Sequence, residues 1–265
     1  MVSLKRTTIP PILFGLLLAA VPGTGAAGEA PPEEEAGPAA SRNLAPEAVA
    51  EGPEDLTGRW YSDFGYLELR QTGLQVEGTY SCCEGTLQGT LKGPQLEFEW
   101  QDPIYGEGWG VLLWKPDEPD RLSGGWGKSD DMGYAGRWFA ARVPDWSFEG
   151  RPTTWLVESE HETFGPLRAT ARLYRSGDAV EGYLEGVYPT EARGEPFRME
   201  VLYRLSGRWE GDRLTLSWQD LARQDEEGSI ELQPLGEGDG ILTGRWEGHL
   251  SASPQRVRLV PAARP

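Results

Sequence analysis

Between residues 56 and 142 the chain alternates apolar and polar positions in short runs separated by Gly, Pro and Asp. Alternation with a period of two places successive side chains on opposite faces of a strand, one facing a core and one facing solvent. Eight evenly spaced strands joined by tight turns predict a closed up-and-down barrel, because closure leaves no edge strand exposed. The predicted strands are 56–62, 65–71, 74–81, 85–91, 95–101, 108–115, 120–127 and 134–142.

The same pattern begins again after residues 144–152. Three segments recur in the same order, which indicates an internal duplication. They are 69–78 with 173–182, 96–102 with 214–220, and 122–126 with 242–246. We therefore expect an all-β fold of two consecutive small eight-stranded up-and-down β-barrels, the first over 56–143 and the second over 153–261. Residues 189–196 and 220–228 are predicted to be long acidic loops of the second barrel.

Residues 1–27 have the three parts of a secretory signal peptide. Lys5 and Arg6 precede an apolar core over 12–21, and small residues follow at 23–27. The core has about half the length that a bilayer-spanning helix needs. The sequence predicts an exported protein, periplasmic or extracellular, with no membrane insertion after signal cleavage; an uncleaved anchor is the alternative.

Residues 28–55 are rich in Pro, Ala and Glu and have almost no large apolar side chains. Such a segment cannot bury enough apolar surface to offset the entropy lost on ordering. We expect a disordered acidic linker, which is either a spacer between the cell envelope and the barrels or a passive tail.

The formal net charge of −17, with no basic cluster, argues against nucleic acid as a partner. The two histidines, His161 and His249, lack the spacing of a metal site, so neither a metal nor another cofactor is expected. The chain has no nucleophile elbow and no phosphate-binding loop. Glu97 and Glu99 alternate with inward residues and should face solvent, which argues against a glycosidase pair. We expect a protein that is not an enzyme.

The two cysteines, Cys82 and Cys83, are adjacent. Their Cα atoms are about 3.8 Å apart along the chain, which is shorter than the usual span of a disulfide. A bond between them needs a distorted turn, and residues 81–85 are predicted to be a hairpin turn. Because oxidation is favoured in exported proteins, Cys82 and Cys83 are candidates for a vicinal disulfide.

Aromatic residues recur where the inward rows of the odd strands end. These positions are Trp60, Tyr80, Trp100 and Trp126, and Trp138 early on the eighth strand should reach the same end. Five aromatic side chains are therefore expected at one mouth of the first barrel. They either plug a narrow barrel or form the walls of a pocket for a sugar or a flat heterocycle.

The first copy resembles the avidin-like barrels, and more broadly the calycins. The resemblance rests on residues 58–65, 78–81 and 109–115, and in calycins a first-strand Trp packs near a last-strand Arg, here Trp60 and Arg142. It covers 56–142 well and 153–261 more loosely, in tandem duplicate, and implies the barrel fold.

Avidin-like proteins grip biotin with polar residues, and this sequence departs from them at those positions. Ser62 stands in place of an Asn, and Tyr66 and Cys82 stand in place of serines, although Tyr80 is kept. The resemblance therefore carries over the fold and not the ligand.

We expect an exported, non-enzymatic tandem β-barrel that binds an unknown small molecule or a protein, the small ligand lying in the aromatic mouth of the first barrel. The alternative is a structural or protein-interaction module of the cell envelope with both barrels plugged. The volume left beneath the aromatic residues distinguishes the two.

Overall fold

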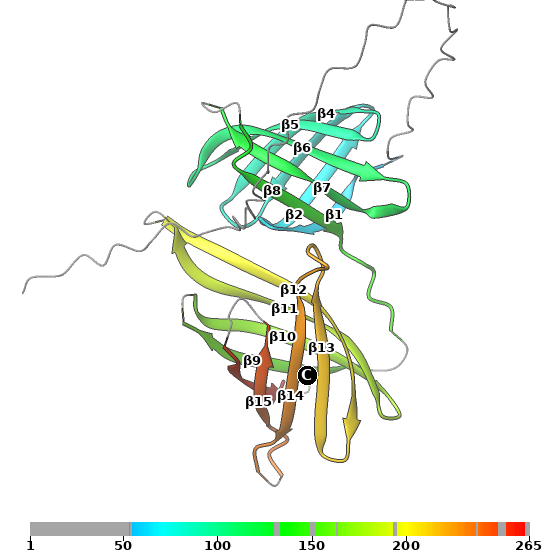
Figure 1. The fold of residues 1–265 in the computed structure, drawn as a ribbon, viewed down its shortest axis with the longest axis vertical. Helices are drawn as coiled ribbons and strands as arrows, with labels where there is room; N and C mark the ends of the chain where they lie inside the picture. The colour runs from blue at the N-terminus through cyan, green and yellow to red at the C-terminus, as the bar shows by residue number, and fades with distance from the viewer. Residues whose placement is uncertain are drawn as a thin grey trace, which may run out of the picture. The chain divides into compact units, whose positions relative to one another are not determined.

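The computed structural model describes residues 53, 55–129, 133–148, 152–162, 164–192, 195–236, 238–248 and 253–262 (Figure 1). The predicted signal peptide and nearly all of the predicted linker lie outside these residues. Both barrels belong to one compact unit, Ala50–Pro265. No helix long and apolar enough to cross a membrane occurs in the ranges just given.

The first barrel contains eight strands, each paired antiparallel with its neighbour in the chain. β1 also pairs with β8, Trp60 opposite Arg142, and this pairing closes the barrel. The strands are β1 Gly58–Ser62, β2 Gly65–Thr72, β3 Gln75–Tyr80, β4 Gly85–Lys92, β5 Gln95–Asp102, β6 Gly106–Lys115, β7 Glu118–Lys128 and β8 Gly136–Arg142.

The second barrel repeats this topology and closes through β16 and β9. The predicted fold class, two eight-stranded up-and-down barrels in tandem, is therefore confirmed, and it is consistent with a calycin-like fold. The strands are β9 Thr153–His161, β10 Gly165–Ser176, β11 Ala179–Ala192, β12 Glu195–Glu210, β13 Arg213–Asp220, β14 Glu227–Pro234, β15 Leu242–Glu247 and β16 Gln255–Pro261.

The prediction of a loop over 189–196 was wrong. The pairing of β11 with β12 continues through Tyr188 opposite Met199 to Ala192 opposite Glu195. β10 accompanies β11 only as far as Val187, so the outer part of the hairpin is a two-stranded ribbon. Among the described residues, the β11 edge of this ribbon has no partner strand beyond Val187, and the missing N–H of a proline is tolerated on such an edge. On the β12 side, the Arg198 N–H donates to the Cys82 carbonyl of the first barrel. The other predicted loop is present between the end of β13 and the start of β14.

Glycines on strands facing the aromatic residues make room for the rings inside the first barrel. A Cβ atom on Gly85 would lie 1.9 Å from Cζ of Tyr80, and one on Gly108 would lie 2.5 Å from Cζ2 of Trp100. Because protein interiors are close-packed, a large ring on one strand requires a small residue on the next. The spacing of glycine and tryptophan along the chain thus sets how the barrel is filled.

Candidate functional site: the aromatic mouth and the barrel junction

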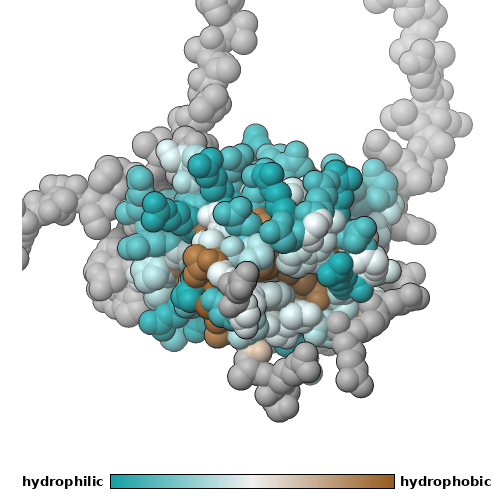
Figure 2. Space-filling view, turned by 90° about the horizontal axis from the view of Figure 1, so that it is seen from below, coloured by the Kyte–Doolittle hydropathy of each residue, from teal (hydrophilic) through white to brown (hydrophobic). Residues whose placement is uncertain are grey.

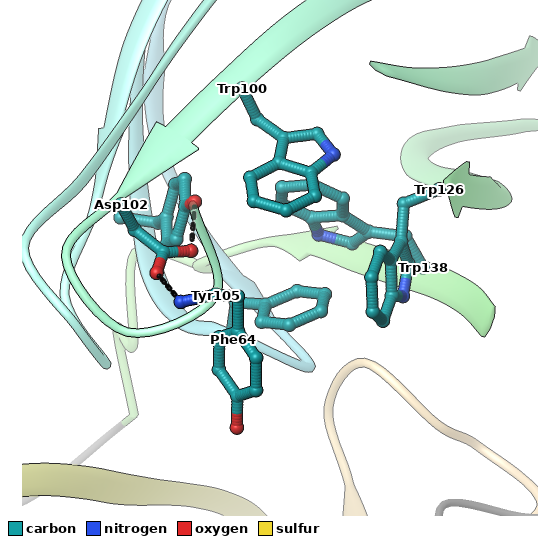
Figure 3. Close-up of a pocket in the computed structure, with 7 residues that line it drawn as sticks. Phe64, Trp100, Asp102, Tyr105, Trp126 and Trp138 are labelled. Atoms are coloured by element: carbon teal, nitrogen blue, oxygen red, sulfur yellow. Dashed lines mark hydrogen bonds between the residues drawn. The ribbon is translucent and has the colours of Figure 1, made fainter. Parts of the chain in front are cut away.

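Four of the five predicted aromatic residues, Tyr80, Trp100, Trp126 and Trp138, meet at one mouth of the first barrel (Figure 3). Trp100 and Trp126 are edge-to-face with ring centroids 5.7 Å apart, and Tyr80 and Trp138 are arranged in the same way at 5.7 Å. Edge-to-face contacts are one of the two favourable geometries for aromatic pairs. The rings therefore pack as a cluster.

Three further residues that the strand pattern did not identify line this mouth: Phe64, Asp102 and Tyr105. Phe64 lies in the β1–β2 turn, where its N–H donates to Ser62 Oγ at 3.1 Å, and its ring centroid is 4.6 Å from that of Trp138. Alternation orients side chains on strands and not in turns, which is why this ring was missed.

Asp102 organises the turn that carries Tyr105. Its Oδ1 accepts the backbone N–H of Ile104 at 2.8 Å and of Tyr105 at 2.6 Å, and its Oδ2 accepts the hydroxyl of Tyr80 at 2.9 Å. An Asp that accepts N–H groups two and three residues ahead forms a recognised turn. The sequence Asp102-Pro-Ile-Tyr105 is therefore the signal from which this turn could have been predicted. Burial, followed by the nearby charge of Asp102, raises the pKa of Tyr80, so its hydroxyl stays protonated.

The cluster leaves little free space. The void among the rings is about 10 Å³, about the minimum that one water molecule needs. Trp138 is 2% exposed, and its indole Nε1 has no hydrogen-bond acceptor among the described residues. The mouth is thus filled by its own side chains and contains one unsatisfied donor.

Trp60 does not line the mouth. Its indole N–H donates to the carbonyl of Leu56 at 3.0 Å, and the guanidinium of Arg142 lies 4.4 Å from its ring centroid. Arg142 also donates to the carbonyls of Thr57 and Asp55 at 2.9 and 3.0 Å. Trp60 and Arg142 make the packing pair that the calycin resemblance implies, and they hold the segment before β1.

Cys82 and Cys83, the candidates for a vicinal disulfide, are buried free thiols in the structure. A hydrogen bond with the Cys83 thiol, together with burial, raises the pKa of Cys82. The residue that follows, Glu84, has a φ of 54°. This value lies in the left-handed backbone region, which residues other than glycine seldom adopt. Whether the pair oxidises in solution stays a prediction.

The turn containing the cysteines contacts the second barrel through β12. The Glu200 carboxylate, 7% exposed, accepts the Ser81 hydroxyl and the Tyr66 N–H, the latter at 2.9 Å. The hydroxyl of Tyr61 donates to the Glu200 carbonyl at 3.0 Å. We call this set of contacts, with those of the β13–β14 loop, the barrel junction.

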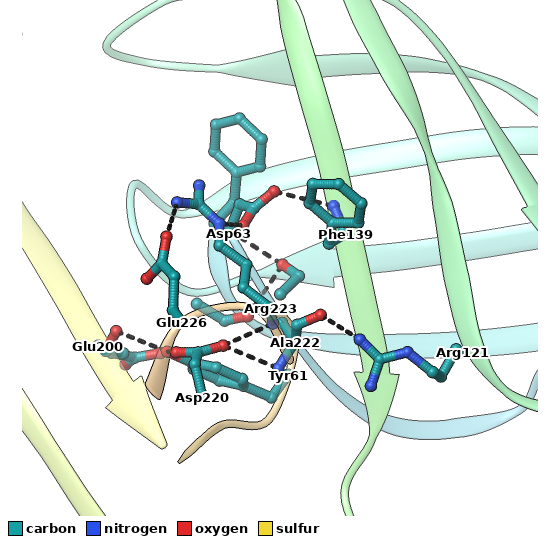
Figure 4. Close-up of polar contacts among 12 residues, drawn as sticks. Tyr61, Asp63, Arg121, Phe139, Glu200, Asp220, Ala222, Arg223 and Glu226 are labelled. Atoms are coloured by element: carbon teal, nitrogen blue, oxygen red, sulfur yellow. Dashed lines mark hydrogen bonds and ion pairs between the residues drawn. The ribbon is translucent and has the colours of Figure 1, made fainter. Parts of the chain in front are cut away.

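The β13–β14 loop completes the barrel junction (Figure 4). Arg223 Nε lies 2.5 Å from Oδ1 of Asp63, whose side chain is 4% exposed, and the Phe139 N–H donates to Asp63 Oδ2 at 2.8 Å. Arg121 of the first barrel donates to the carbonyls of Leu221 and Ala222 at 3.3 and 2.6 Å. Burial raises the pKa of Asp63, and the charge of Arg223 opposes the shift.

Asp220, at the end of β13, is also buried at the junction. It accepts the N–H groups of Ala222 and Arg223, both at 2.8 Å, and the hydroxyl of Tyr61 at 3.5 Å. Burial raises its pKa to about 7. Tyr61 and Ala222 pack with Leu202 in an apolar cluster at the same place.

A groove of about 250 Å³ lies beside the junction. Outward side chains of β6, β7 and β8 form one wall, and the β13–β14 loop forms the other. Its lining residues include Leu113, Lys115, Glu118, Arg121, Phe139, Ala222 and Arg223. Within the described ranges, no three His, Cys, Asp or Glu side chains lie close enough to hold a metal ion.

The structure thus gives two closed barrels, one aromatic mouth and a polar junction as the features from which a function can be inferred. The junction was not foreseen from the sequence, because Asp63 and Glu200 read as solvent-facing residues until their partners are known. Comparison of the chain with family models, with curated proteins and with solved structures gave no match.

Proposed function

We propose that this is an exported, non-enzymatic protein that binds another protein through the outer surface of its paired barrels. The filled mouth of the first barrel is the observation that carries this proposal. A void of about 10 Å³ is far below the roughly 300–1,000 Å³ of pockets that hold small ligands. Export rests on the signal-like leader at residues 1–27.

The buried polar groups support a binding role over catalysis. The Asp63 carboxylate pairs with Arg223, and the Glu200 carboxylate accepts the Ser81 hydroxyl. These groups, which in an enzyme are the usual acid and base candidates, hold the two barrels together and do not face an open cleft.

The groove beside the junction is the surface that we propose for the partner. It combines Leu113, which is 43% exposed, with charges of both signs from Lys115, Glu118 and Arg121. An apolar centre within a polar rim is the usual anatomy of a protein interface. The face shown in Figure 2 is mostly hydrophilic, with hydrophobic side chains only in small patches between hydrophilic ones, as expected of a surface in water.

A photo-reactive amino acid in place of Leu113 tests this proposal in the protein expressed by its source cells. We expect cross-links to one defined protein, identified by mass spectrometry. Leu74, 64% exposed and outside the groove, is the matched control and should give none. Equal cross-linking at the two positions would contradict the proposal.

A second candidate function is supported by Trp138. Its buried indole N–H lacks an acceptor among the described residues, and an oxygen of a small planar ligand would supply one. The mouth would have to open through Phe64 and Tyr105, both of which lie in turns. Tryptophan-fluorescence titration with glycans, biotin analogues and small aromatic compounds tests this, and replacing Tyr105 with Ala should strengthen any binding by widening the mouth.

We further propose that both barrels derive from one avidin-like barrel. The Trp60–Arg142 contact and the repeated Trp-Gln-Asp at 100–102 and 218–220 support a common origin. Biotin does not follow from it, because the biotin-gripping positions are changed.

A further inference from the structure

The turn with the adjacent cysteines is also one of the parts of the first barrel that the backbone of β12 contacts. The carbonyl of Cys82 accepts the N–H of Arg198 at 3.1 Å. One residue earlier, the Ser81 hydroxyl donates to the Glu200 carboxylate. The same short turn therefore holds two thiols and two contacts to the second barrel.

The carbonyl that accepts the Arg198 N–H belongs to the peptide group between the two cysteines. A bond between Cys82 Sγ and Cys83 Sγ would close an eight-membered ring that includes this peptide group. Adjacent Cα atoms are about 3.8 Å apart, and disulfides usually span about 4.4–6.8 Å, so the backbone must distort when the ring closes. The acceptor of the Arg198 hydrogen bond would move with it.

The turn is already constrained before any bond forms. Cys82 N–H donates to the carbonyl of Phe64 at 3.2 Å, and Glu84 has a φ of 54°. Residues in sparsely populated backbone regions persist only where their surroundings hold them, and they cluster at switch regions. The turn is therefore hydrogen-bonded to β12 on one side and to Phe64 on the other.

We propose that Cys82 and Cys83 form a dithiol–disulfide switch, in which oxidation by a disulfide-bonded oxidant breaks the hydrogen bond from the Arg198 N–H of β12 to the Cys82 carbonyl of the first barrel. One thiolate attacks a sulfur of the oxidant, which gives a mixed disulfide and releases one oxidant thiol. The second cysteine thiolate then attacks the first cysteine sulfur, which closes the ring and releases the second oxidant thiol. The cysteines lose two electrons and two protons, and the oxidant gains both as two thiols.

Burial controls when this exchange happens. Cys82 and Cys83 are 3% and 5% exposed, and the mutual hydrogen bond and burial hold Cys82 in the unreactive thiol form. The oxidant therefore reaches the pair only after the turn opens locally. Once formed, the disulfide keeps the turn in a conformation that no longer presents the Cys82 carbonyl to β12.

The test equilibrates the full chain in mixtures of reduced and oxidised glutathione and follows ring closure by the loss of two hydrogen masses. Amide hydrogen exchange is then measured at Arg198 and, as an internal reference, at Leu216 in β13. Loss of a single hydrogen bond predicts exchange about tenfold faster at Arg198 in the oxidised protein and no change at Leu216. Oxidised protein with unchanged exchange at Arg198, or no oxidation at any ratio, would overturn the proposal.

The double variant C82A/C83A provides the control, because alanine keeps the site apolar and cannot form the ring. It should show the same Arg198 exchange in reducing and oxidising buffers. If the double variant does not fold, C82S/C83S serves, since it too has no thiol and cannot close the ring. A redox response at Arg198 that persists in either variant would also overturn the proposal.

Discussion

Asp102 and Asp220 occupy equivalent positions in the two barrels, and their second carboxylate oxygens accept hydroxyls from different places. Each uses Oδ1 to accept N–H groups two and three residues ahead. Oδ2 of Asp102 accepts the Tyr80 hydroxyl from its own barrel, and Oδ2 of Asp220 accepts the Tyr61 hydroxyl from the other barrel. The side chain of Asp102 therefore makes a contact within one barrel, and the equivalent side chain of Asp220 makes a contact between the two barrels.

Substitutions at two other equivalent positions account for this difference. Leu184 stands in the second barrel where Tyr80 stands in the first, so Asp220 has no tyrosine from that position. Arg223 stands where Tyr105 stands, and it pairs with Asp63 of the first barrel while Tyr105 lines the mouth of its own barrel. The turn after β5 therefore lines the mouth of the first barrel, whereas the equivalent turn after β13 joins the two barrels.

Asp220 should make the stability of the barrel pair depend on pH. Burial raises its pKa from 3.8 to about 7, so the folded protein holds this proton more tightly than the unfolded chain. The resulting stabilisation is fully present below pH 3.8 and is lost as the pH rises through 7. We expect the unfolding free energy of the unmodified protein to fall by an amount on the order of 2–4 kcal/mol between pH 5 and pH 8. The variant D220N stays neutral and should not show this fall.

Urea unfolding at four pH values between 5 and 8 measures this dependence. D225N, which removes an exposed carboxylate from the same loop, controls for the loss of one negative charge near the junction. Parallel pH profiles for D220N and the unmodified protein would contradict the prediction.

Removing only one partner of the Asp63–Arg223 pair should lower the free energy of unfolding. Replacing Arg223 with Met leaves a carboxylate that is 4% exposed without its cation, and uncompensated buried charges typically cost about 3–5 kcal/mol. R213M breaks a surface pair with Glu231, about half exposed on both sides, and should cost at most about 1 kcal/mol.

The double variant D63N/R223M separates charge from packing at the same site. It removes both charges, and we expect it to regain most of the stability lost in R223M. Equal urea midpoints for R223M and R213M, or no recovery in the double variant, would show that the pair is not buried in solution.

Alternation was sufficient to predict the barrels because each strand must bury one face, whatever its partners. Alternation did not predict where in the barrel the Trp60 ring lies. Position along an odd strand gives the face of a side chain, but the stagger of a tilted barrel separates equivalent positions in height, and the Trp60 ring packs toward Leu56 and Arg142. Turn residues such as Phe64 have no period to orient them.

The junction was beyond sequence pattern for a different reason. Asp63 lies just after β1, Glu200 lies within β12 and Arg223 lies in the β13–β14 loop. Charged residues are usually exposed. Only the docking of the β13–β14 loop and β12 against the first barrel buries the two carboxylates. No local periodicity encodes a contact between segments so far apart in the chain.

Gly85 should be intolerant of even one methyl group. A Cβ atom there would lie 1.9 Å from Cζ of Tyr80, and overpacking of this kind typically costs about 1–3 kcal/mol. We expect G85A to lower the unfolding free energy by that amount. G236A, where a Cβ meets nothing within 4 Å, should be close to neutral. Thermal unfolding of the two variants compares them directly, and a neutral G85A would mean that the Tyr80 ring lies elsewhere.

Trp60 and Trp138 are both almost fully buried tryptophans, and they should respond differently to replacement by Phe. W60F removes a hydrogen bond to the Leu56 carbonyl and weakens the stacking of Arg142, which are each worth about 0.5–1.5 kcal/mol. W138F loses a similar ring area, but it also removes an N–H that has no acceptor among the described residues, and such a donor costs about 1–3 kcal/mol. We therefore expect W60F to be destabilised more than W138F in urea. If W138F is the less stable variant, the Trp138 N–H has an acceptor in solution, and a ligand oxygen in the mouth becomes the leading explanation.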